Sequence, residues 1–178
     1  MRDQSEHTGG SLWWLGVTFA AFWAGLIAHE GAHYATSWWA RVVGLRSETG
    51  SVLVPAAGPL MSLVIVAACA VLIHRSRHVI TKRIAFVTAT AAASRIFLIA
   101  VPTMQGKSND EHSVMLATGW SARTIWTVEA ALTTLLLMWI VQRSGVRLLP
   151  WHVGMTLIGI LAGWVSALTF GRAMGLPI

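Results

Sequence analysis

Long apolar runs separated by short polar connections make up most of this chain. They cover approximately residues 12–39, 52–73, 84–102, 124–141 and 151–170. A helix needs about 20 apolar residues to cross a bilayer, and each run is close to that length. A shorter, mildly apolar stretch at 114–123 is typical of a helix at the membrane interface. The pattern predicts an all-α polytopic membrane protein with about five transmembrane helices.

Composition supports lipid as the surroundings of the chain. Hydrophobic residues make up 55% of it and charged residues only 11%, with a mean hydropathy of +0.63. A soluble domain carries about 25% charged residues, and the ten tryptophans suit a membrane–water interface. The net charge of +6 is spread over the short connections, as juxtamembrane charge is. We therefore expect a multi-pass protein of the cell membrane and no nucleic-acid partner.

Glycine and proline mark two places where helix geometry is expected to be special. Pro55, Gly58 and Pro59 stand near the start of the second run and predict a broken or kinked helix there. Such backbone is tolerated at membrane depth only when it is buried in protein or lines a wet cavity. In the last run, Gly159-x-x-x-Gly163 predicts a close approach to another helix.

The strongest chemical signal is His29-Glu30-Gly31-Ala32-His33, an H-E-x-x-H pattern inside the first apolar run. Ionisable side chains at bilayer depth are costly, so three of them together indicate a functional site. Residues four apart lie on one helix face, so both imidazoles can bind one zinc ion. Glu30 projects about 100° around the helix from His29. It can therefore act as a general base on a water molecule without binding the metal itself.

A third metal ligand is expected in the polar connection after the third run. The first and third runs end on the same membrane side, because two crossings separate their ends. Asp110 is our candidate, since a carboxylate suits zinc beside two imidazoles. Its neighbours Glu111 and His112 remain alternatives. If these residues have no role at the metal, they simply form a solvated acidic loop.

Two further charges lie inside apolar runs, Arg95 in the third and Glu129 in the fourth. We predict that they form a buried ion pair between these helices. The functional alternative is that Arg95 stabilises a developing oxyanion or orients a metal ligand.

Three segments together resemble the site-2 protease family of intramembrane zinc metalloproteases. The H-E-x-x-H run is similar to the family's first motif, and Ala57-Gly58-Pro59-Leu60-Met61-Ser62 is similar to its A-G-P-L-x-N/S signature. Asn109-Asp110 is placed like the family's aspartate ligand. The resemblance covers about residues 12–120. The chain differs in having Ser108-Asn109-Asp110-Glu111 around the aspartate and Ser62 where many relatives have asparagine, and it contains no PDZ or CBS module.

The resemblance implies a catalytic core of three spans at about 12–120, followed by accessory spans at about 124–170. We expect the whole chain, 1–178, to form one membrane-embedded domain. One zinc ion per chain would be held by His29, His33 and Asp110, with Glu30 catalytic. The substrate strand would lie beside Gly58 and Pro59. The remaining candidates are Ser62 and Asn109 at the substrate, and Arg95 and Glu129 behind the ligands.

The expected function is that of a zinc-dependent intramembrane endopeptidase acting on a membrane-protein substrate. One alternative is an inactive relative that serves as a membrane partner or regulator; another is a zinc-dependent membrane enzyme with a non-peptide substrate. A homo-oligomer is also compatible with the sequence. Seven basic residues against five favour a cytoplasmic N-terminus. The resemblance instead places the site near the cytoplasm, and we expect the side of the Asp110 connection to be cytoplasmic.

Overall fold

The computed structural model describes residues 5–44, 52–105, 110–144 and 150–173, and in these ranges the chain is helical with no strand. The helices are α1 (Ser5–Val42), α2 (Leu53–Arg75), α3 (Val79–Leu98), α4 (Ala100–Met104), α5 (Asp110–Thr118), α6 (Ala122–Ser144) and α7 (Pro150–Ala173). Four of the predicted apolar runs each fall in one helix, and the run at 84–102 is divided between α3 and α4. The prediction of an all-α fold is confirmed.

Three of the described helices are long and apolar enough to cross a membrane. They are Leu12–Val42 in α1, Leu53–Arg75, which is α2, and Ala122–Arg143 in α6. The protein is accordingly an all-α polytopic membrane protein. The other two predicted spans lie in α3 with α4 and in α7, which contains the apolar segment Gly154–Phe170. The total of five spans stays a prediction.

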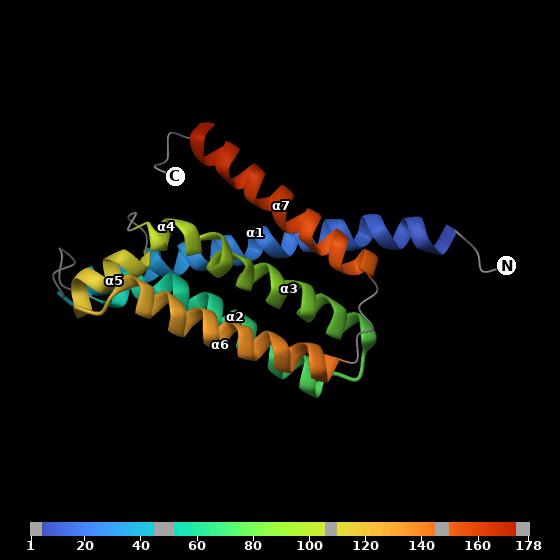
Figure 1. Cartoon of the computed structure of the whole chain (residues 1–178), viewed down its shortest axis with the longest axis horizontal. Helices are drawn as coiled ribbons and strands as arrows, with labels where there is room; N and C mark the ends of the chain where they lie inside the picture. Colours follow the sequence, from blue (N-terminus) through green and yellow to red (C-terminus); the bar gives the residue numbers. More distant parts are fainter. Residues whose placement is uncertain (1–4, 45–51, 106–109, 145–149, 174–178) are drawn as a thin grey trace.

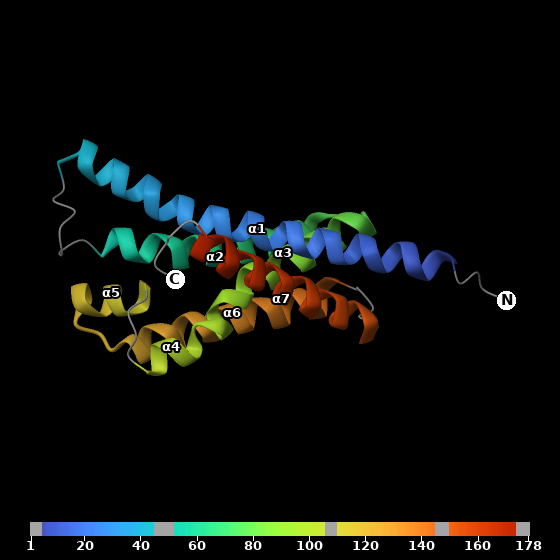
Figure 2. The same cartoon turned by 90° about the horizontal axis from the view of Figure 1, so that it is seen from above.

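The helices form a bundle with α2 and α3 at its centre. One side of this pair is covered by α1 and the other by α6, while α7 packs mainly across α1 (Figures 1 and 2). The carboxyl-terminal end of α1 lies at the same end of the bundle as α4 and α5 (Figure 1). This arrangement confirms that the ends of the first and third predicted spans face the same side.

Small side chains let α3 occupy the centre of the bundle. Its inward residues Ala85, Ala89 and Ala93 are at most 4% exposed. The outer faces of the bundle keep large apolar side chains exposed, such as Leu135 on α6 and Leu161 on α7. Exposed apolar surface of this extent marks a surface that lipid or another protein covers.

The glycine pair in α7 makes the close helix approach that the sequence predicts. A Cβ atom added to Gly159 would lie 2.8 Å from Thr18 Cβ on α1. One added to Gly163 would lie 2.5 Å from Phe22 Cγ. Real side chains never approach so closely, so α7 can pack at this distance from α1 only because both positions lack a side chain.

The segment around Pro59 does not interrupt the second span. α2 is one unbroken helix from Leu53 to Arg75, with Pro59 inside it. Pro55 lies in the first turn, where its missing N–H has no helical partner to lose. Pro59 removes one further backbone hydrogen bond, and the helix continues through it.

Helix α5 begins earlier than the predicted interfacial helix at 114–123. Asp110, Glu111 and His112 form its first turn and are not part of a loop. Carboxylates in the first turn of a helix are stabilised by the helix dipole. This turn holds Asp110 at a fixed position relative to α1, α2 and α3.

Candidate metal centre

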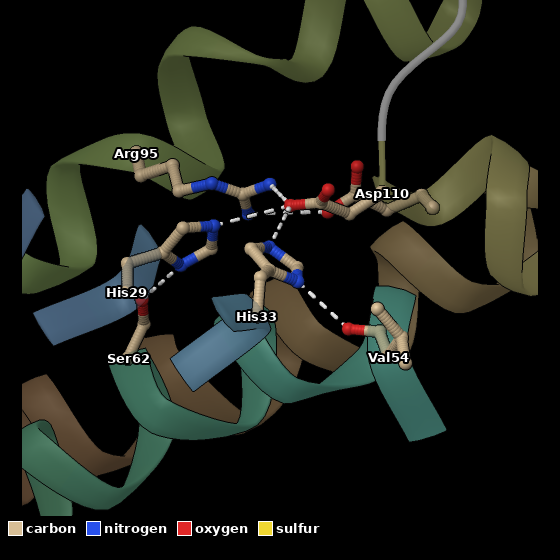
Figure 3. Close-up of polar contacts among 7 residues, drawn as sticks. His29, His33, Val54, Ser62, Arg95 and Asp110 are labelled. Carbon is tan, nitrogen blue, oxygen red and sulfur yellow. Dashed lines mark hydrogen bonds and ion pairs between the residues drawn. The ribbon is translucent and has the colours of Figure 1, made fainter. Parts of the chain in front are cut away.

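The two histidines of the H-E-x-x-H motif lie on the face of α1 that packs against α2. His29 is only 2% exposed, and the ring centroids of His29 and His33 are 5.0 Å apart. On α2, His29 Nδ1 is 3.1 Å from Ser62 Oγ, and His33 Nδ1 donates to the carbonyl oxygen of Val54 at 2.7 Å. These contacts fix both rings, so that their Nε2 atoms turn toward the same point (Figure 3).

Asp110 supplies a carboxylate at that point. Its Oδ2 lies 3.1 Å from His29 Nε2 and 3.3 Å from His33 Nε2 (Figure 3). The ligand atoms of the three residues all lie within 4.8 Å of one another. In the part of the chain that the structure describes, His29, His33 and Asp110 form the group that can hold a metal ion. The three residues predicted as ligands are therefore brought together by α1 and α5.

The chemistry of these donors fits a cation. A carbonyl oxygen only accepts hydrogen bonds, so Nδ1 of His33 must carry the proton in its contact with Val54. In neutral His33 the Nε2 atom is then an acceptor, and it faces the Asp110 carboxylate, which is an acceptor too. Two acceptors at 3.3 Å repel each other unless a proton or a metal ion lies between them. In known metal sites, a hydrogen bond at the second ring nitrogen orients the imidazole toward the metal, as the Nδ1 contacts do here.

The spacing also suits tetrahedral coordination. Bonds of about 2.0–2.2 Å at tetrahedral angles place neighbouring ligand atoms about 3.3–3.5 Å apart. The two Nε2–Oδ2 separations, 3.1 and 3.3 Å, are close to these values.

Gly58 makes room for the two imidazoles. A Cβ atom at this position would lie 2.5 Å from His29 Nε2 and closer still to His33 Nε2. Any side chain here would therefore displace the very nitrogens that face Asp110. The absence of a side chain at Gly58 allows α2 to support both rings along its backbone.

The alternative third ligands do not join the group. Glu111 is fully buried, and its Oε1 pairs with Arg95 Nη1 at 3.2 Å. His112, the other alternative, is not among the three residues whose ligand atoms converge. The geometry therefore favours Asp110.

Arg95 binds the acidic pair at the start of α5, and the predicted Arg95–Glu129 pair is wrong. Its guanidinium contacts Asp110 Oδ2 (Figure 3). It also contacts Glu111 Oε1. Arg95 lies one turn before the end of α3, next to the first turn of α5, so these carboxylates are within its reach. Glu129, on α6, is 5% exposed, and its carboxyl group lies within hydrogen-bond reach of that of Glu111.

The surroundings of Asp110 favour its ionised form. Burial by itself would raise the pKa of this carboxyl. Its contacts with His29 and His33 and the charge of Arg95 outweigh burial and lower the pKa well below its ordinary value. Asp110 therefore presents a carboxylate to the two imidazoles over the whole physiological pH range.

The four residues predicted at the substrate lie in different surroundings. Gly58 and Ser62 touch the histidine rings, so both support the ligands. Pro59, the next residue after Gly58, lines an apolar cavity between α2, α5 and α6. Asn109 lies outside the described residues.

Glu30 lies on the exposed side of the motif. Its charge is close enough to act on the His33 imidazole, and no ion pair of Glu30 with another described residue is present. An exposed carboxylate beside the ligands remains available for proton transfer.

Sequence reasoning missed the Val54 carbonyl, and it considered Glu111 as a metal ligand but not as the partner of Arg95. Val54, Gly58 and Ser62 are spaced four apart on α2, like His29 and His33 on α1. Two antiparallel helices with this matching spacing place Val54 opposite His33 and Ser62 opposite His29. The spacing was therefore a usable signal, whereas nothing local marks Glu111 as the partner of Arg95.

No family model matches the sequence, and comparison of the chain with curated proteins and with solved structures gives no significant match.

Proposed function

We propose that this protein is a zinc-dependent intramembrane endopeptidase. The observation that carries the proposal is the convergence of His29 Nε2, His33 Nε2 and Asp110 Oδ2 within a bundle of apolar helices. Two imidazoles and one carboxylate are a ligand set of known catalytic zinc sites, and three protein ligands leave a fourth position open. The resemblance of the two motif segments to the site-2 protease family supports the same ligand set.

The residues around the site would divide the chemistry among them. Bound zinc would supply a Lewis acid that polarises the scissile carbonyl and makes water a stronger acid. Glu30 would accept the proton of the attacking water and pass it to the leaving amine. Arg95 would hold the Asp110 carboxylate in place through its ion pair. Burial of His29 would limit the access of bulk water to the ligands.

The substrate we infer is a transmembrane or membrane-proximal segment of another protein. The candidate site lies among helices whose outer faces are apolar, so a peptide in the same bilayer would reach it by lateral diffusion. We further propose that the end of the bundle formed by α4 and α5 faces the cytoplasm. A cysteine introduced at exposed Trp120, in a Cys69→Ala background, would then react with an impermeant thiol reagent from the cytoplasmic side only.

The experiment that tests the proposal is the Glu30→Gln substitution. Wild-type protein in nanodiscs should cleave members of a panel of labelled single-span peptides, with the products identified by mass spectrometry. Glu30→Gln should lower the rate by at least about a hundredfold, because it removes the general base. Its zinc content should remain that of the wild type, since Glu30 is not a ligand.

Two results would contradict the proposal. Normal cleavage by Glu30→Gln would exclude this residue as the base. Stoichiometric zinc without cleavage of any peptide would instead indicate a membrane partner or regulator, or an enzyme with a non-peptide substrate. Chelation of zinc should stop cleavage, and cleavage should return when zinc is restored. Glu30→Gln protein purified in the same way is the control for contaminating proteases.

A further inference from the structure

A cavity of about 470 Å³ lies between α2, α5 and α6, next to the candidate metal centre. Two chain neighbours of the centre belong to its lining: Pro59 follows Gly58, and Glu111 follows Asp110. The rest of the lining is mostly apolar, with Leu63 from α2. Cavities of this volume are large enough for a ligand of several side chains.

Two buried carboxylates interrupt this apolar lining. Glu111 is 0% exposed and Glu129 is 5% exposed, and both line the cavity. Arg95 pairs with Oε1 of Glu111, whereas no donor among the described residues reaches Glu111 Oε2 or either carboxylate oxygen of Glu129. The carboxyl groups of Glu111 and Glu129 lie within hydrogen-bond reach of each other. Buried polar groups are nearly always paired, because an unpaired one keeps the cost of losing water. Two facing carboxyl groups beside one apolar cavity therefore need either a shared proton or a ligand that donates hydrogen bonds.

We propose that the cavity binds a lysine side chain of the substrate. An ammonium group has three donors and no acceptor, so it can donate hydrogen bonds to both of the facing carboxylates. The four-carbon stem of lysine is apolar and would lie along the apolar lining. Arg95 cannot take this role, because its guanidinium is already paired with Asp110 and Glu111.

This inference rests on the proposed function and names a preference of the same site. Pro59 and Glu111 line the cavity, and each directly follows a residue of the candidate metal centre, Gly58 or Asp110. A lysine held in the cavity would therefore place nearby peptide bonds close to the centre. Glu111 and Glu129 would thereby determine which segment of a membrane protein is cut.

A binding experiment tests the preference without depending on cleavage. The probe is a capped apolar pentapeptide that carries one photo-leucine and a central lysine. Its matched control has norleucine, which lacks only the amine, in the central position. Each peptide is cross-linked to the protein in phosphatidylcholine nanodiscs. Labelling of α2 and α6 is expressed relative to labelling of α7. Helix α7 is the reference because none of its described residues lines the cavity.

The lysine peptide should label the cavity helices at least about tenfold more strongly than the norleucine peptide, because a hydrogen bond to a charged group is worth more than one factor of ten. Glu129→Gln should remove this preference. Glu30→Gln should keep it, although that variant would be inactive as a protease. The lysine preference is measured by binding and does not depend on cleavage. It would therefore still be observed if the proposed catalytic mechanism failed.

Equal labelling by the two peptides of wild-type protein would overturn the inference without any variant. It is the result expected if Glu111 and Glu129 simply share a proton. A lysine preference that Glu129→Gln leaves unchanged would also overturn it. A third contrary result would be loss of labelling when phosphatidylethanolamine is added to the nanodiscs, since the amine held by the cavity would then belong to a lipid.

Discussion

Helix α1 meets glycines of neighbouring helices in two regions with different consequences. In its amino-terminal half, Phe22 lies where a side chain of Gly163 on α7 would be. In its carboxyl-terminal half, His33 lies where a side chain of Gly58 on α2 would be. The first contact brings apolar surfaces together. The second brings two imidazoles against the α2 backbone and turns their free nitrogens toward Asp110. The same absence of a side chain thus serves helix packing in one region and ligand placement in the other.

The largest effect is expected from Gly58→Ala. Its methyl group would overlap the ring atoms of His29 and His33, so at least one imidazole must leave its position. Loss of a partner that only orients a ligand weakens metal binding by about 10–100-fold. Displacement of a ligand itself should exceed that range. Competition with a chromophoric zinc chelator in detergent measures the change.

Gly31→Ala is the matched control for that substitution. Gly31 lies between the two histidines on α1, and nothing is found within 4 Å of an added Cβ. Its zinc affinity should remain at the wild-type value, and alanine favours the helix by about 0.5–1 kcal/mol. If both glycine variants lost zinc equally, close packing at Gly58 would not be the reason.

Ser62→Ala should have the next largest effect, also on the metal. The substitution removes the partner of His29 Nδ1 but leaves the ring and its Nε2 atom in place. Zinc affinity should fall by about 10–100-fold, as measured by the same competition. Ser62→Thr keeps the hydroxyl and should retain more affinity than alanine. An unchanged affinity in Ser62→Ala would show that the Ser62 contact does not orient the ligand.

Gly163→Ala should destabilise the bundle and leave the metal in place. An added methyl group would overlap the Phe22 ring, and overpacking of this kind costs about 1–3 kcal/mol. Unfolding in mixed micelles, followed by circular dichroism, gives the free energy of unfolding. Gly154→Ala, also on α7, is the control, because nothing lies within 4 Å of its added Cβ. A loss of zinc in Gly163→Ala without a loss of stability would remove the distinction between the two regions.

The smallest effect is expected from Trp14→Phe, at the same packing interface. Trp14 Nε1 donates to Thr156 Oγ1 on α7 at 2.7 Å. Phenylalanine keeps most of the ring but not the donor, so the free energy of unfolding should fall by about 0.5–1.5 kcal/mol. Zinc content should not change. A loss of stability as large as that of Gly163→Ala would show that this hydrogen bond, and not close packing, dominates the interface.

The helices and the convergence of the candidate ligand residues could be predicted because their signals are local. Apolar runs of bilayer length fix the positions of α1, α2 and α6, and the four-residue spacing of His29 and His33 fixes a common face. The side on which Asp110 lies follows from counting crossings. None of these steps needs the packing distance between two helices.

The partners of the charged groups could not be predicted, because they depend on how the helix ends meet. Arg95 was expected to reach Glu129 through the interior, yet α5 begins at Asp110 and places two carboxylates nearer to it. Glu129 is consequently left at the cavity without an ion pair among the described residues. Ser62 was predicted to contact the substrate, and only the pairing of α2 with α1 reveals its contact with His29.

The zinc content of purified protein tests the central claim most directly. Mass spectrometry of the metal should find about one zinc per chain in the wild type and none in the His29→Ala/His33→Ala double variant. His74→Ala/His78→Ala provides the control, because these exposed histidines are also four apart but lie at the connection between α2 and α3. The control should retain the wild-type content. Wild-type protein without stoichiometric metal, or zinc retained after loss of His29 and His33, would contradict the metal centre.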